Sequence, residues 1–140
     1  MSISELLEFI NSKVPTFQNS EIIGPGEAFH YTMHSEAIQR DGIIKGRPID
    51  KDIDCTQSSI TSTPATDSGG VVFSYADLEE AKLEAYVMPE DKLNVKILKI
   101  KYKQAIRTTH IQEEFFSEAP ETIIIIASDI IDFKIAFSKK

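Results

Sequence analysis

Two places in this sequence combine residue types that could carry out chemistry. The first is His30-Tyr31-Thr32, where an imidazole, a phenol and a hydroxyl follow one another at the end of an apolar segment. The second is Glu121, which stands just before the isoleucine run at residues 123–126. An imidazole can hydrogen-bond a polar ligand, and one well-placed carboxylate can stabilise a positive charge that develops in a transition state. The chemistry depends on whether the fold brings these two places together.

The element that must position His30 is a short strand. Apolar and aromatic residues surround the histidine, so we predict a buried strand over residues 28–33. A short helix should follow, because Ser35 is suited to cap its start and Gly42 to adopt the left-handed conformation that ends a helix. Taken alone, such a histidine is more often a hydrogen-bonded core residue than a ligand-binding group. The interpretation of His30 therefore depends on the residues downstream.

The first part of the chain also contains a longer helix and two loops. Ser2 and Glu5 have the spacing of a capping box, and the apolar residues after them recur at helical spacing, which predicts an amphipathic helix over residues 3–13. Turn-forming residues predict a loop over residues 16–27. The polar tract at residues 50–69 predicts a long loop that is either disordered or functional, and its position before a strand favours a lid or a substrate-facing loop.

The second part of the chain is rich in strands. The predicted strands cover residues 70–74, 93–102, 106–111, 123–126 and 130–137, with one helix over residues 77–85. The alternation of apolar and polar residues changes register after Ile97, which predicts a bulge. The isoleucine run is apolar on both faces, as expected of a central strand. These elements predict an α+β fold with a mainly antiparallel sheet and few short helices.

The composition fits one domain. The chain has 140 residues, of which 41% are hydrophobic, and this is enough to form one core. We therefore predict a single domain over residues 1–140. Within it, residues 1–27 form an N-terminal helix and loop, and residues 28–140 form the core. The formal net charge of −7 disfavours general attraction to nucleic acid or to anionic membranes. Cys55 is the single cysteine and can form no internal disulfide, and no targeting or membrane segment is evident. We therefore expect a cytoplasmic protein with no membrane partner.

Other kinds of site fit the sequence less well. His30 and His34 would lie about 13 Å apart along a strand, so we expect no metal site. Cys55 stands in a polar tract without a nucleophile signature, and the chain has no glycine-rich phosphate-binding loop.

Three lysines, Lys99, Lys101 and Lys103, recur at alternate positions along the predicted strand. Such a face is typical of a solvated sheet edge that resists aggregation. With Lys96 and Arg107, the same lysines could also contact a phosphate-bearing target.

The order of the motifs is informative. A strand with His30-Tyr31-Thr32 is followed by a short helix that ends in glycine, by the strand Gly70-Val71-Val72-Phe73 that runs into a helix, and by Glu121 before an aliphatic run. This order resembles the ADP-ribosyltransferase superfamily, in the branch typified by diphtheria toxin and the poly(ADP-ribose) polymerases, whose members carry His, Tyr and Glu on successive core strands. The resemblance covers roughly residues 28–137. It implies a compact ADP-ribosyltransferase-like fold with a split β-sheet core.

The resemblance also implies roles for the residues of the first two motifs. His30 would hydrogen-bond a ribose hydroxyl of the substrate NAD. Tyr31 would hold the nicotinamide amide through its backbone N–H and C=O groups, and Thr32 occupies the position of a small hydroxyl residue. Gly70 and Phe73 match the glycine and phenylalanine of the second motif strand, so we expect them at the NAD site.

The aromatic pair of the family can be aligned in two ways. Tyr75 and Tyr86 are separated by ten residues, which resembles the paired tyrosines that stack on nicotinamide. If the glycine and phenylalanine of the second motif are aligned instead, Val72 and Leu83 take the positions of the two stacking aromatic residues. The first alignment makes Tyr75 a catalytic candidate and Tyr86 a second binding residue, whereas the second makes both of them ordinary tyrosines at a helix boundary.

Glu121 matches the catalytic glutamate of the family. By this resemblance its carboxylate would hydrogen-bond the nicotinamide ribose and stabilise the charge that develops as nicotinamide leaves. Arginine-modifying relatives carry a second glutamate two residues earlier, where this chain has Ala119, which argues against arginine as the target.

The implied function is a toxin-like ADP-ribosyltransferase that releases nicotinamide from NAD and transfers ADP-ribose to a protein or nucleic acid acceptor. If it is an effector, the resemblance implies delivery to a host cytoplasm. A non-catalytic nucleotide- or protein-binding module on the same scaffold is the main alternative. A third possibility is an activity like that of the RNA 2′-phosphotransferases, which are relatives within the same superfamily. Two features of this chain disfavour it: the chain is acidic, and it lacks the His-Gly and multiple-arginine pattern of those enzymes.

Overall fold

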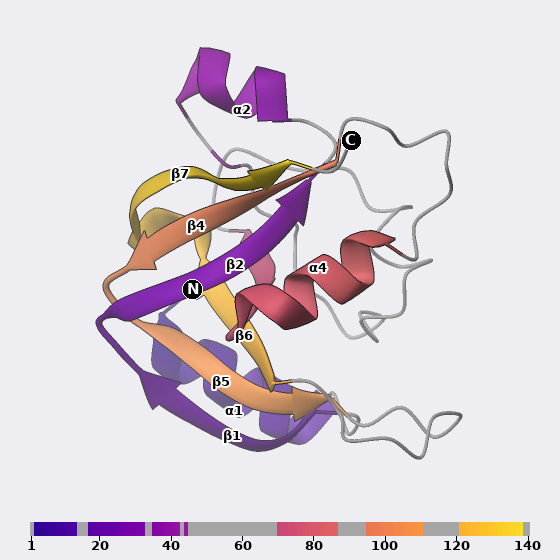
Figure 1. Ribbon diagram of the computed structural model, residues 1–140. Helices are drawn as coiled ribbons and strands as arrows, with labels where there is room; N and C mark the ends of the chain where they lie inside the picture. Colours follow the sequence, from indigo (N-terminus) through magenta and orange to yellow (C-terminus); the bar gives the residue numbers. More distant parts are fainter. Residues whose placement is uncertain are drawn as a thin grey trace.

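The computed structural model describes residues 2–13, 17–32, 35–42, 44, 70–86, 95–110 and 121–138. In chain order, the elements are α1 (Ile3–Lys13), β1 (Phe17–Ile23), β2 (Gly26–Thr32), α2 (Ser35–Asp41), β3 (Val71–Tyr75), α4 (Leu78–Tyr86), β4 (Lys96–Tyr102), β5 (Ala105–His110), β6 (Glu121–Ile126), the short 3-10 helix η1 (Ala127–Asp129) and β7 (Ile130–Ser138). The fold is α+β, with a seven-stranded antiparallel sheet and few short helices, as predicted (Figure 1).

The sheet is split in its middle. Its strand order is β1-β5-β6-β3-β2-β4-β7. Most neighbouring strands pair at four or more positions, but β2 and β3 meet only at Phe29 and Tyr75. The sheet therefore consists of a four-stranded sub-sheet, β1-β5-β6-β3, and a three-stranded sub-sheet, β2-β4-β7. We call the contact between Phe29 and Tyr75 the junction.

Three short connections join the two sub-sheets. Gly24 and Pro25 link β1 to β2, Lys103 and Gln104 link β4 to β5, and η1 links β6 to β7. In each case the linked strands belong to different sub-sheets. Because so few residues cannot span a flat sheet, the sub-sheets must turn toward each other.

The main core cluster lies between the inner faces of the two sub-sheets. From the three-stranded sub-sheet it includes Ala28, Leu98, Ile100 and Tyr102, and from the four-stranded sub-sheet Val72, Ala105, Ile123 and Ile125. Ile38 of α2 joins this cluster, which explains why the short helix stays attached to the sheet.

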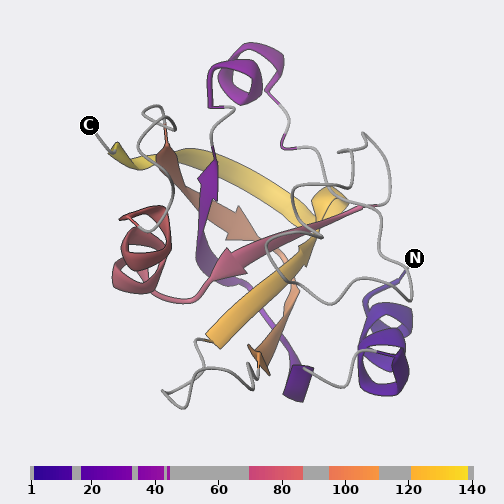
Figure 2. The ribbon, with the colours of Figure 1, turned by 90° about the vertical axis from the view of Figure 1, so that its right-hand side faces the viewer.

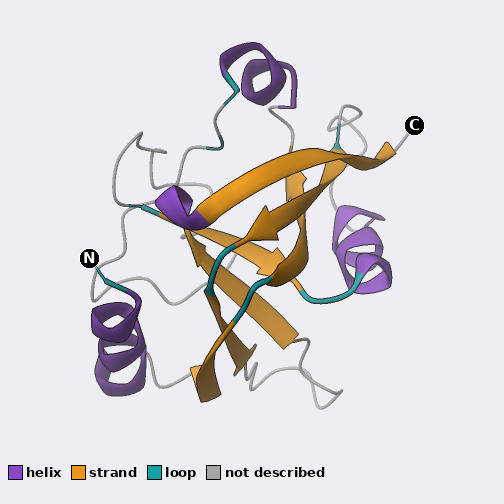
Figure 3. Ribbon diagram, turned by 90° about the vertical axis from the view of Figure 1, so that its left-hand side faces the viewer, coloured by secondary structure: helices purple, strands orange, loops and turns teal. Residues whose placement is uncertain are grey.

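The outer faces of the sub-sheets carry the other two helices. Leu6 and Ile10 of α1 pack against Val71 and Ile124 of the four-stranded sub-sheet. Ala81 of α4 packs in a further cluster with residues of β2, β3 and β4. Figures 2 and 3 show α1 and α4 on opposite sides of the curved sheet, with α2 at one end.

Helix α1 begins with the predicted capping box. The Ser2 N–H donates to Glu5 Oε1 and the Glu5 N–H donates to Ser2 Oγ, both at 3.2 Å. The hydrogen bonds from Ser2, above all the one from its backbone, lower the pKa of the Glu5 carboxyl. The helix runs over Ile3–Lys13, so the prediction is confirmed. The predicted end of α2 is confirmed as well, since Gly42 has φ +69° and its N–H donates to Ile38 O at 2.8 Å.

Replacing Ser2 by alanine should lower Tm by a few degrees at neutral pH, because the Glu5 N–H loses its acceptor. The pKa of the Glu5 carboxyl is lower in the folded state than in the unfolded state. The stability that ionised Glu5 contributes to the fold is therefore complete above the unfolded pKa and is lost as pH falls through the folded pKa. Thermal unfolding of both proteins at neutral pH and at about pH 3 checks this. Both proteins should lose the Glu5 contribution in acid, because the Ser2 backbone N–H that chiefly lowers the Glu5 pKa is present in both, so most of the difference in Tm should remain. A difference that disappears in acid would contradict this account.

The predicted loop over residues 16–27 is wrong. Most of it forms the edge strand β1, and Gly26 and Glu27 already belong to β2. Strand β1 carries a bulge between Gln18 and Glu21, where Asn19 adopts φ +57°. Ser20 Oγ lies 2.8 Å from Thr108 Oγ1, which fixes the bulge to β5. The sheet therefore begins at Phe17, not at residue 28, because an edge strand tolerates the polar residues that had suggested a loop.

The prediction that the lysine face is a sheet edge is also wrong. Lys99 and Lys101 lie on β4, which pairs with β2 on one side and β7 on the other, and Lys103 lies beyond the strand. The predicted register change is present at Ile97 and Leu98, but the extra residue is Ala136 of β7.

The predicted polar loop at residues 50–69, including Cys55, lies outside the described residues, as does His34. Among the residues that the structure describes, no helix is both long enough and apolar enough to cross a membrane.

Candidate functional site

His30 lies beside the junction of the two sub-sheets. Its Nδ1 is 2.7 Å from the backbone oxygen of Phe73 on β3. A carbonyl oxygen can only accept, so Nδ1 carries the proton and donates this hydrogen bond. In the neutral imidazole, Nε2 is then the nitrogen that can accept a hydrogen bond from a ligand hydroxyl. The imidazole bridges β2 and β3 where their backbones separate.

Tyr31 contacts both of the other predicted aromatic groups. Its ring lies nearly parallel to the ring of His30, with centroids 6.4 Å apart. It is also nearly parallel to the ring of Tyr75, at 6.2 Å. These distances are in the range of favourable ring contacts. The structure thus brings the first motif and Tyr75 together at the junction, with Tyr31 as the residue that contacts both.

Glu121 approaches the junction from the other sub-sheet. It is the first residue of β6, and the next residue, Thr122, pairs with Tyr75. The backbone oxygen of Glu121 accepts a hydrogen bond from Ala76 N at 3.4 Å. Its side chain is exposed. The carboxylate is therefore held close to the junction by the backbone and remains accessible to a ligand.

The register of the strands decides which side of the sheet each group occupies. Opposite residues in an antiparallel ladder share a face, and successive residues alternate. Phe29, Tyr75 and Thr122 are in register, so they share the outer face that α4 covers. By alternation, His30 and Glu121 belong to the inner faces that the sub-sheets turn toward each other. Tyr75 is on the other side of the sheet from Glu121.

The remaining predicted binding residues are distributed along the two strands. Thr32 is buried on the same side of β2 as His30. The ring of Phe73 packs near Phe17 under α1, at 6.4 Å, so only its carbonyl takes part in the site. Gly70 lies at the far end of β3, where its oxygen accepts from Ala127 N at 2.9 Å. The side chain of Tyr86 lies outside the described residues.

The alternative alignment of the aromatic pair gives a different result. Val72 is buried on the inner face, in the same cluster as Ile125. Leu83 projects from α4 and is 60% exposed. This alignment therefore places an aliphatic side chain on the inner face, whereas Tyr75 supplies an aromatic ring on the outer face.

The carbonyl of Phe73 is the group of the candidate site that the sequence did not identify. Its role depends on backbone position, which no residue type signals. Among the described residues, no group of three His, Cys, Asp or Glu side chains could hold a metal ion. Comparisons with protein-family models, curated proteins and solved structures found no match. The functional interpretation therefore depends on the geometry of the junction and on the motifs that it brings together.

Proposed function

We propose that the protein is an ADP-ribosyltransferase that binds NAD, releases nicotinamide and transfers ADP-ribose to a macromolecular acceptor. One arrangement supports the proposal: His30 directly follows Phe29 and Glu121 directly precedes Thr122 in the row of paired residues Phe29, Tyr75 and Thr122, and alternation assigns both to the inner faces of the two sub-sheets. Their strands and the strand of Tyr75 are consecutive neighbours in the order β6-β3-β2. The arrangement agrees with the family motif of His, Tyr and Glu on successive core strands.

In this proposal His30 binds NAD through Nε2. The hydrogen bond from Nδ1 to Phe73 O fixes the ring and its tautomer, so that Nε2 can accept from a ribose hydroxyl. The imidazole thereby orients the nicotinamide ribose relative to the carboxylate. Orientation of this kind lowers the barrier without any charge on the histidine.

Glu121 stabilises the transition state. As the bond between nicotinamide and ribose breaks, its electron pair leaves with nicotinamide and positive charge develops on the ribose. A carboxylate on the inner face can stabilise this charge and hydrogen-bond a ribose hydroxyl. The acceptor nucleophile then attacks the ribose carbon and loses its proton.

Two substitutions of His30 separate ligand binding from structural support. His30→Asn keeps an N–H donor near the position of Nδ1 and can still donate to Phe73 O, but it has no group at the position of Nε2. His30→Ala lacks both groups. We expect both variants to lose nicotinamide release from NAD by at least about tenfold, with Tm lowered only in His30→Ala.

The measurement is chromatographic detection of nicotinamide after incubation of the pure protein with NAD, alongside thermal unfolding of each variant. Normal turnover by His30→Asn would show that the histidine only supports the fold. Absence of nicotinamide release by the unmodified protein, with and without candidate acceptors, would overturn the enzymatic proposal.

A second candidate function is a non-catalytic module that binds NAD or ADP-ribose. The position of Tyr75 favours it, because this ring packs against Tyr31 on the outer face and not on the side of Glu121. Calorimetry with NAD and with ADP-ribose distinguishes the two candidates. Binding of either compound without turnover supports the module, and no binding of either contradicts both.

A further inference from the structure

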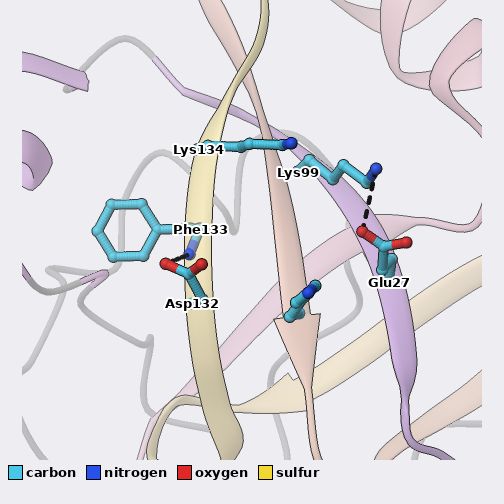
Figure 4. A pocket seen from close by; sticks show the side chains of 6 residues that line it. Glu27, Lys99, Asp132, Phe133 and Lys134 are labelled. Atoms are coloured by element: carbon cyan, nitrogen blue, oxygen red, sulfur yellow. Dashed lines mark hydrogen bonds and ion pairs between the residues drawn. The ribbon is translucent and has the colours of Figure 1, made fainter.

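A hollow of about 250 Å³ lies on the outer face of the three-stranded sub-sheet. Glu27, Lys99, Lys101, Asp132, Phe133 and Lys134 line it (Figure 4). Its charged side chains come from three adjacent strands, β2, β4 and β7. The hollow is on the opposite side of the sheet from the inner faces of His30 and Glu121, so it is distinct from the site proposed for NAD.

Two lysines oppose each other directly across this hollow. Lys99 of β4 pairs in register with Lys134 of β7. Figure 4 shows the side chain of Lys134 extending across β4 toward Lys99. Like charges at directly opposite positions destabilise a sheet. Such an arrangement between the inner strand β4 and the edge strand β7 costs stability, which is a common property of binding sites.

The two carboxylates only partly compensate this charge. Glu27 Oε2 lies 3.1 Å from Lys99 Nζ. Asp132 Oδ1 accepts from the backbone N–H of Phe133 at 2.8 Å (Figure 4). Within the part of the chain that the structure describes, neither Lys101 nor Lys134 has an ion-pair partner. Lys101 stands in register with Glu27 on one side and Asp132 on the other, so the three lysines and two carboxylates leave the hollow with one positive charge in excess and one remaining oxygen on each carboxylate.

The two kinds of group point to one class of ligand. Ammonium groups bind phosphate, and carboxylate oxygens accept hydrogen bonds from hydroxyls. A simple anion would use the lysines but would be repelled by the carboxylates. The volume is below the roughly 300 Å³ at which pockets begin to enclose drug-sized ligands, so the bound group is small.

We propose that this hollow binds a phosphorylated sugar. Lys101 and Lys134 hold the phosphate, and the second oxygens of Glu27 and Asp132 accept hydrogen bonds from the sugar hydroxyls. The ligand is a free sugar phosphate or the sugar-phosphate part of a nucleotide. The inference does not depend on the proposed transferase activity, because none of its residues belongs to the junction.

The test is titration of the full chain with ribose 5-phosphate, followed by calorimetry and by amide NMR. We expect saturable binding, with shifts concentrated at β4 and β7 around Lys101 and Lys134. Lys101→Gln and Lys134→Gln should each weaken binding by about tenfold. Both side chains are exposed, so both variants should fold, and Lys134→Gln should not lower Tm because it removes the repulsion with Lys99. Lys103→Gln, an exposed neighbour outside the hollow, is the matched control and should bind normally.

Three further ligands sharpen the test. Inorganic phosphate should bind at least about tenfold more weakly than ribose 5-phosphate, because it has no sugar hydroxyls. Ribose alone should also bind weakly. Binding of AMP as tightly as ribose 5-phosphate supports the nucleotide source, and weaker binding of AMP supports the free sugar phosphate.

Several results would overturn the proposal. These are no binding of ribose 5-phosphate, unchanged affinity in both lysine variants, equal affinity for inorganic phosphate, or shifts located at His30 instead of Lys101. Loss of nicotinamide release in a His30 variant with normal ribose 5-phosphate binding would separate this site from the proposed transferase site.

Discussion

Replacing Glu121 by glutamine is expected to lower kcat for nicotinamide release by about a hundredfold to a thousandfold. Glutamine keeps the size of the side chain and can still hydrogen-bond a ribose hydroxyl, but it carries no negative charge. In the proposed mechanism the charge acts on the transition state and only weakly on bound NAD, so KM should change little. Steady-state kinetics of nicotinamide release over a range of NAD concentrations measures both constants.

Because Glu121 is exposed, its substitution should change the activity without changing the stability of the fold. The side chain is exposed, and its backbone oxygen, which accepts from Ala76 N, is unchanged by the substitution. Tm of Glu121→Gln should therefore match that of the unmodified protein. Glu8→Gln, at an exposed position of α1, is the control and should retain full activity. A raised KM with normal kcat in Glu121→Gln would show that the carboxylate only binds NAD.

Local signals in the sequence predicted the helices well. The capping box of Ser2 and Glu5 located the start of α1, and Gly42 located the end of α2. Both features involve residues within one helical turn, so the sequence contains all the information needed. The burial of Ile123 and its neighbours in β6 was predictable for a similar reason, because a run of apolar residues fits only a strand covered on both faces.

Strand β1 could not be predicted in the same way. Its polar residues and the left-handed Asn19 are typical of a loop. It becomes a strand because β5, more than 80 positions later in the chain, offers a pairing edge and the Thr108 hydroxyl that contacts Ser20. The lysines of β4 could not be placed from local sequence either, because β4 becomes an inner strand only through its pairing with β2 and β7.

The sequence selected the residues of the candidate site, whose roles stay a prediction, but it could not supply their geometry. The motifs identified His30 and Glu121, which the fold brings to the two sides of the junction. The side on which Tyr75 lies depends on its register with Phe29 and Thr122, and a shift of one residue would reverse it. The contact between His30 and Phe73 O likewise requires the separation of β2 from β3, which no single segment encodes.

The split between the sub-sheets depends on how tightly the short connections pack. Gly24, in the connection from β1 to β2, has φ +140°. A Cβ at this position would lie 2.5 Å from Lys103 O and 2.7 Å from Gln104 Cα, which belong to the connection from β4 to β5. Both contacts are with backbone atoms that cannot rotate away. The close approach of these two connections holds the sub-sheets at their mutual angle, and it requires glycine.

Replacing Gly24 by alanine should therefore lower the free energy of unfolding by about 2–4 kcal/mol, through both the clash and the unfavourable φ. Gly42→Ala is the matched control, because Gly42 also has a positive φ but has nothing within 4 Å of the position that the alanine methyl group would take. It should cost only about 1–2 kcal/mol, the conformational part of the penalty. Urea unfolding of both variants measures the two losses. Equal losses would show that the two connections can move apart, and the angle between the sub-sheets, on which the proposed NAD site depends, would then not be fixed by Gly24.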